Sequence, residues 1–150
     1  FSTCCRVPAM LAGVPPEQQR ALENYGLDLG MAYQLIDDLL DFTADEKTLG
    51  KPTVNDLREG KLTLPLIYLL RRGETIHEEL VRTVITDRGF TRVRREAILE
   101  PLRDLGCLDE GREKAIRYAE RARGHLDLLP ESAYKDALHS VLDFVIQRDR

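Results

Sequence analysis

Residues 30–61 of this 150-residue chain read GMAYQLIDDLLDFTADEKTLGKPTVNDLREGK, and their first half repeats polar and apolar side chains with the period of an α-helix. On a helical wheel that turns about 100° per residue, three aspartates fall within about 60° of Gln34. The other directions are covered by apolar side chains, namely Leu35, Ile36, Leu39, Leu40 and Phe42. The pattern predicts a helix buried nearly all round. Its acidic stripe, which consists of Gln34, Asp37, Asp38 and Asp41, would face an internal cavity.

The acidic stripe predicts a metal site. Carboxylates one helical turn apart repel each other by roughly 0.2–0.5 kcal/mol per pair in water, and by more in a cleft of low dielectric. We therefore expect a cation between Asp37, Asp38 and Asp41. Oxygen ligands suit a hard cation, and Mg²⁺ in particular binds through one or two carboxylates, several waters and substrate phosphates.

The segment after this helix supplies positive charge. Its lysines alternate with residues that favour loops, in the order Lys47, Gly50, Lys51, Pro52, Gly60 and Lys61. Such a loop can place ammonium groups over the mouth of an acidic cleft, and lysine binds phosphate as a point charge. Carboxylates that hold a metal, together with lysines that neutralise phosphate, indicate an enzyme that acts on a diphosphate.

The runs YQLIDDLLD, LGKP, NDL and EGKLTLP resemble the second aspartate-rich motif and the following loop of the trans-polyprenyl diphosphate synthases, most closely the long-chain, octaprenyl type. The similarity extends over essentially all 150 residues. It covers only the carboxy-terminal half of such an enzyme, without the first aspartate-rich motif and the basic residues that hold isopentenyl diphosphate. The resemblance implies that residues 1–150 are a fragment of an isoprenoid-synthase-type helical bundle, inactive alone.

The resemblance also implies a reaction and a metal site. A Mg²⁺-dependent prenyltransferase would condense isopentenyl diphosphate with an allylic diphosphate, giving a long-chain all-trans polyprenyl diphosphate such as a quinone side-chain precursor. Asp37 would be the direct metal ligand. Asp38 and Asp41 would hold metal-bound waters or complete the metal shell. A homodimer is a further implication of the family.

Four more positions take expectations from the family. Lys51 and Lys61 would pair with diphosphate oxygens, and Gln34 would face the allylic substrate. Asp56 matches a family acid in the loop. Lys47 lies outside the matched positions, and we expect it at the surface.

Two other classes of protein remain open at this point. A related terpene cyclase would follow its aspartate motif with an Asn/Asp, Ser and Glu metal triad, but here the third acid is Asp41 and GKPTVNDLREGK follows, which argues against it. The stronger alternative is a non-catalytic helical partner subunit or half-site module of a prenyl synthase.

Composition narrows the class of protein. With 43% hydrophobic and 32% charged residues, the chain is typical of one domain with a hydrophobic core. A formal net charge of −4 gives no basic footprint for nucleic acid. No apolar run approaches the ~20 residues of a transmembrane helix, and we expect a cytoplasmic protein. Cys4, Cys5 and Cys107 lack metal-ligand spacing, so we expect reduced, packed thiols.

The periodicity throughout is helical, which predicts an all-α fold of six or seven helices. Gly26 and Gly30 would lie inside the longest helix, where they either admit a neighbouring helix closely or allow a kink. His77, His125 and His139 share no spacing and are expected to be surface or hydrogen-bonded residues. The predicted helices cover residues 1–12, 16–43, 64–72, 74–86, 91–105, 109–129 and 132–150, with a loop over 45–60.

Overall fold

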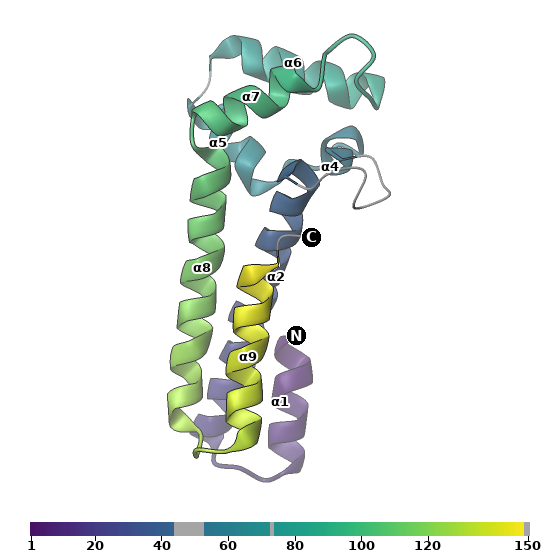
Figure 1. Ribbon diagram of the computed structural model, residues 1–150. Coiled ribbons are helices and arrows are strands. Elements are labelled where there is room, and N and C mark those ends of the chain that lie inside the picture. The colour runs from purple at the N-terminus through teal and green to yellow at the C-terminus, as the bar shows by residue number, and fades with distance from the viewer. Residues whose placement is uncertain (44–52, 73, 149–150) are drawn as a thin grey trace. The chain divides into compact units, whose positions relative to one another are not determined.

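A computed structural model describes residues 1–43, 53–72 and 74–148, and confirms an all-α fold (Figure 1). The described residues contain no strand and form eight α-helices with one 3₁₀ turn, η1. The helices are α1 (Ser2–Leu11), α2 (Pro16–Thr43), α4 (Asn55–Arg58), α5 (Leu64–Arg72), α6 (Thr75–Asp87), α7 (Glu96–Asp104), α8 (Cys107–His125) and α9 (Ala133–Gln147), with η1 at Leu126–Leu128.

Most predicted helix bounds agree with the structure, and the differences have local causes. α2 and α5 begin and end where the sequence predicts. α7 is shorter than its predicted range of 91–105, because the Asp87 carboxylate accepts hydrogen bonds from Thr91 and Arg92 and holds the chain in a bend after α6. One helix, the four-residue α4, was not predicted and lies inside the predicted loop. The described residues therefore contain one helix more than the upper predicted number of seven.

The chain divides into two compact units, and α2 and α8 contribute to both. Unit 1 consists of Phe1–Ile36 and Lys114–Arg148, and unit 2 contains Asp37–Glu113. In unit 1 the helices α1, α2, α8 and α9 run side by side (Figure 1). None of the described helices is long and apolar enough to cross a membrane.

Polar contacts connect the helices of unit 1. The Tyr25 hydroxyl of α2 donates to the main-chain oxygen of Leu138 in α9 at 2.9 Å. The most buried charge is Asp28 of α2, whose side chain is 7% exposed and accepts hydrogen bonds from Arg121 and His125 of α8. These contacts fix which helix faces which.

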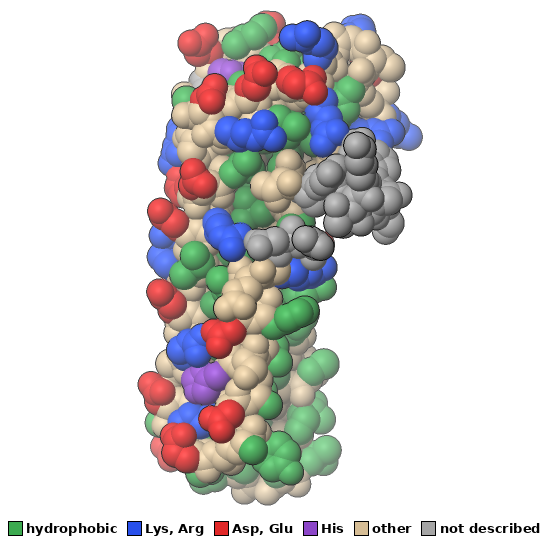
Figure 2. Space-filling view, viewed as in Figure 1, with side chains coloured by type: hydrophobic (Ala, Val, Ile, Leu, Met, Phe, Trp, Pro, Cys, Tyr) green, Lys and Arg blue, Asp and Glu red, His purple; other side chains and the backbone are tan. Residues whose placement is uncertain are grey.

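The two glycines of α2 admit α1 closely, which confirms the first of the two alternatives for them. A Cβ atom added at Gly26 would lie 2.7 Å from the main-chain oxygen of Phe1. A Cβ added at Gly30 would lie 3.2 Å from side-chain atoms of Phe1. The outer face of α1 is apolar and exposed, and hydrophobic side chains gather there in Figure 2. The exposed hydrophobic residues of α1 include Val7, Met10 and Leu11.

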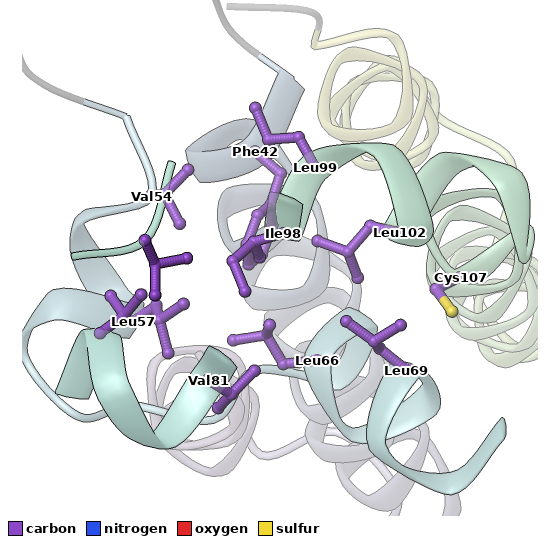
Figure 3. Packing of buried hydrophobic residues seen from close by; sticks show 12 residues of the cluster. Phe42, Val54, Leu57, Leu66, Leu69, Val81, Ile98, Leu99, Leu102 and Cys107 are labelled. Atoms are coloured by element: carbon purple, nitrogen blue, oxygen red, sulfur yellow. The ribbon is translucent and has the colours of Figure 1, made fainter. Parts of the chain in front are cut away.

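Unit 2 is organised around a cluster of twelve buried residues from the end of α2 to the start of α8 (Figure 3). The predicted core helix α5 contributes Leu66 and Leu69, and α7 contributes three residues. The cluster consists of Phe42, Val54, Leu57, Leu66, Leu69, Val81, Val84, Val93, Ile98, Leu99, Leu102 and Cys107.

The expectations for cysteine and histidine are mostly confirmed. All three cysteines are free thiols, and Cys107 is packed in the core, where burial raises its pKa. Cys4 is exposed, so the expectation of a packed thiol is wrong there, because it lies on the outer side of α1. The histidines are hydrogen-bonded or lie beside a charged partner, as expected: His77 with the Glu74 main chain, His125 with Asp28, and His139 with Arg123.

Candidate metal and diphosphate site

The predicted acidic stripe lies at the end of α2, and its surroundings differ from the prediction. The five apolar residues interleaved with it are all buried. However, Gln34 and Asp37 are exposed, and Asp38 and Asp41 are half-buried. The prediction of an enclosed cavity is therefore wrong for the described residues, because the elements packed on α2 cover only its apolar directions.

The carboxylates do not form a closed metal cage. Within the described residues, no three His, Cys, Asp or Glu side chains come together in a way that could hold a metal ion. The donors still fit Mg²⁺, since this ion keeps several waters and needs only one or two protein carboxylates beside substrate phosphates. The exposed carboxylate of Asp37, one residue before Asp38, is a donor of that kind.

Asp41 has a role that the sequence did not reveal. Its Oδ1 accepts the backbone N–H of Asn55 at 3.0 Å, and its Oδ2 accepts that of Asp56 at 3.0 Å. Its main-chain oxygen accepts the N–H of Val54 at 2.7 Å. Desolvation raises the pKa of Asp41, while the two N–H groups at its carboxylate act in the opposite direction. Asp41 therefore caps α4 from a different helix.

The residue that precedes α4 explains why such a cap is needed. Val54 has no side-chain oxygen with which to cap the helix, and no side-chain cap is formed there. It also adopts a left-handed backbone conformation, with φ 58°, although it is a fully buried β-branched residue. That conformation is costly for valine and persists only where neighbouring contacts hold it.

Lys61 is joined to α4. Its ammonium group lies 3.0 Å from Oδ1 of Asp56 and 2.8 Å from Oε2 of Glu59. The backbone N–H of Lys61 also donates to the main-chain oxygen of Asp56 at 2.8 Å. The hydrogen bonds that its ammonium group donates to the carboxylates of Glu59 and Asp56 raise the pKa of Lys61 above its ordinary value, so the side chain is charged. The structure thus brings Asp41, Asp56 and Lys61 into one connected group.

The other predicted site residues are placed differently. Lys51, together with Lys47, lies outside the described residues. Gln34 lies in the same helix as Asp37 and precedes it by three residues, but it belongs to unit 1, whereas the aspartates belong to unit 2.

A cavity of about 550 Å³ lies beside α4. Its described lining comes from α4, from the turn after it and from the end of α6, and includes none of Asp37, Asp38 and Asp41. The lining residues are Asn55, Arg58, Glu59, Gly60, Ile85 and Arg88. The residues of the acidic stripe are thus not among the described residues that line this cavity.

With this geometry established, comparison with known proteins identifies the class. The sequence model of one family, described as Polyprenyl synthetase, matches residues 1–100. The chain belongs to this family, as its motifs predicted.

Individual relatives agree with this assignment. The chain is 39% identical over 150 residues to an octaprenyl diphosphate synthase of Escherichia coli (strain K12), covering all of this chain and 46% of the relative. It is 35% identical over 148 residues to a geranylfarnesyl diphosphate synthase of Natronomonas pharaonis, covering 99% of this chain and 42% of the relative. The chain therefore spans about half the length of these relatives, whose names specify different products.

A solved structure extends the similarity to three dimensions. The polyprenyl synthase from Caulobacter crescentus CB15, crystallised with calcium and isoprenyl diphosphate, superposes with a TM-score of 0.84 at 34% sequence identity. The match covers all of this chain and 46% of that structure. The chain thus shares the fold of a polyprenyl synthase over about half of that structure's length.

Proposed function

We propose that the chain is the carboxy-terminal half of a trans-polyprenyl diphosphate synthase of the long-chain type. In the whole protein it would condense isopentenyl diphosphate with an allylic diphosphate. The observation that carries the proposal is the acidic stripe at the end of α2, with Asp37 exposed, followed by the Asp56 and Lys61 pair, in a chain of this family. The homodimer and the cytoplasmic location remain predictions.

Asp37 and Asp38 would hold Mg²⁺, with Asp41 beside them. When bound, the metal neutralises the charge that grows on the diphosphate as its carbon–oxygen bond breaks. The double bond of isopentenyl diphosphate then attacks the allylic carbon, and loss of a proton restores an alkene.

The chain's other polar residues would bind and orient the allylic diphosphate. Lys61 carries its charge at the surface, where a diphosphate oxygen can take the place of a carboxylate partner. Lys51 would bind the same group, and Gln34 would orient the allylic substrate.

A single carboxylate stripe holds a leaving group from one side only. Catalysis requires both substrates in fixed positions, and the first aspartate-rich motif of the family is not in this sequence. We therefore propose that residues 1–150 alone do not catalyse prenyl transfer, and that the upstream half of the protein completes the site.

The test is an assay of the whole protein with farnesyl diphosphate, radiolabelled isopentenyl diphosphate and Mg²⁺, followed by extraction of labelled lipid. Asp37→Ala should lower turnover by at least about 100-fold, since metal stabilisation of developing charge is worth several kcal/mol. Asp104→Ala, which changes an exposed aspartate at the end of α7, is the control and should retain activity. Equal losses would contradict the metal assignment, and an inactive unsubstituted protein would favour the partner-subunit alternative.

A further inference from the structure

Asp41 connects the end of α2 to the segment that contains Asp56 and Lys61. It accepts hydrogen bonds from three consecutive backbone N–H groups, those of Val54, Asn55 and Asp56, at distances of 2.7, 3.0 and 3.0 Å. Both carboxylate oxygens and the main-chain oxygen are used. Three bonds to one residue fix the direction in which the chain leaves Val54, and not merely its distance from α2.

The conformation of Val54 requires this anchor. A left-handed valine is held only where its surroundings determine its backbone. On one side its buried side chain lies in the core of unit 2 with Leu57, and on the other its N–H is bound to Asp41. Loss of the hydrogen bonds that Asp41 accepts would let the backbone relax toward an ordinary conformation, which would turn α4 away from its present direction.

The effect would reach Lys61 through Asp56. Asp56 is bound to Asp41 by its N–H, and it binds Lys61 by both its main-chain oxygen and its carboxylate. The position of the lysine ammonium group therefore depends on Asp41 through a continuous series of hydrogen bonds within unit 2.

The same contacts make Asp41 a poor metal ligand. Each carboxylate oxygen already accepts an N–H group, which offsets part of its negative charge and fixes its orientation toward α4. Asp37 is more exposed and is the better candidate for direct contact with a cation.

We propose that Asp41 is a positioning residue, which anchors the start of α4 and so places Asp56 and Lys61 for the allylic diphosphate, and that it does not coordinate the metal. The proposal rests on the proposed function, because it assumes that Lys61 binds the diphosphate. It gives the third aspartate of the stripe a role different from that of the first two.

The experiment compares Asp41→Asn with Asp37→Asn in the whole protein. Three quantities are measured: Mn²⁺ affinity by electron paramagnetic resonance, amide hydrogen exchange of residues 54–61, and the KM for farnesyl diphosphate. We expect Asp41→Asn to speed exchange of the Asn55 and Asp56 amides by about tenfold or more, because the asparagine side chain has one acceptor oxygen where the carboxylate has two, and it carries no charge. It should also raise KM about tenfold and leave Mn²⁺ affinity within about twofold.

Asp37→Asn should give the reverse pattern, with Mn²⁺ affinity reduced about tenfold or more and the exchange of residues 54–61 unchanged. Asp41→Glu, which keeps the charge but displaces the carboxylate, is the second variant and should resemble Asp41→Asn. Exchange of α5 and α7 amides reports whether each variant is folded.

Two results would contradict the proposal that Asp41 is a positioning residue. One is a loss of Mn²⁺ affinity in Asp41→Asn equal to that in Asp37→Asn, with the Asn55 and Asp56 amides still protected. The other is faster exchange with an unchanged KM, which would reduce Asp41 to a purely structural cap. Unchanged Mn²⁺ affinity in Asp37→Asn would instead refute the metal site of the proposed function, so the two failures are distinguishable.

Discussion

The buried carboxylate of Asp28 stabilises unit 1, and the loss of stability on its removal can be calculated from its contacts. Its side chain is 7% exposed, and it accepts two hydrogen bonds from Arg121, at 2.5 and 3.2 Å. Hydrogen bonds to charged groups contribute about 1.5–3 kcal/mol. Because the Arg121 side chain is 61% exposed, water can solvate it when the carboxylate is lost. We therefore expect Asp28→Asn to lower the free energy of unfolding by about 2 kcal/mol, in the lower part of that range.

Asp143→Asn is a matched control for Asp28→Asn. Asp143 also pairs with an arginine of α8, Arg123, at 2.5 Å, but its side chain is 53% exposed. Exposed ion pairs are worth about 0.2–1 kcal/mol. The same chemical change should therefore cost clearly less at Asp143 than at Asp28.

The assay is equilibrium urea unfolding of the purified chain, followed by circular dichroism. With an m-value of about 1–3 kcal/mol per molar urea, a loss of about 2 kcal/mol moves the midpoint by roughly 0.7–2 M. Equal midpoint shifts in the two variants would refute the reasoning that burial decides the value of the pair. Arg121→Lys is an additional variant, and should also destabilise because lysine cannot make both bonds.

Three further predictions concern pH, the core and the diphosphate. Side-chain hydrogen bonds from Arg92 and Thr91 lower the pKa of Asp87 to about 2. This folded-state pKa lies below the value of about 3.9 for an unfolded aspartate. Asp87 therefore stabilises the fold above about pH 3.9, and this stabilisation is lost as the pH falls toward 2. In thermal melts, the melting temperature of Asp87→Asn should fall less between these two pH values than that of the unsubstituted protein. Leu102→Ala, at a fully buried position, should lower the free energy of unfolding by about 2–5 kcal/mol in the same urea assay. Lys61→Gln should weaken binding of a non-hydrolysable allylic diphosphate analogue by about tenfold to a hundredfold in calorimetry, whereas Lys47→Gln should not.

The helices could be predicted because their signals are local. Pro16 opens α2, and the apolar period runs without interruption to Thr43. The same period predicted the acidic stripe. By contrast, α4 has four residues and no local cap, since its capping carboxylate lies fourteen residues upstream, at Asp41. A cap from another helix leaves no spacing signal in a single sequence, so neither α4 nor the role of Asp41 could be predicted. The exposure of the stripe was also missed, because helical periodicity shows which side of a helix is polar but not whether another element covers it.

The close contact between α1 and α2 has a consequence for how the sequence can diverge. A side chain at position 26 would meet the main-chain oxygen of Phe1 at 2.7 Å, and no change of rotamer can relieve that clash. At position 30 the nearest atoms are Cβ, Cδ2 and Cγ of Phe1, at 3.2, 3.2 and 3.3 Å, and a shift of this side chain by a few tenths of an ångström would make room. Replacement of Gly30 therefore requires only a small shift of one side chain, whereas replacement of Gly26 requires the main chain at the start of α1 to move. Two glycines one turn apart are thus under unequal evolutionary constraint.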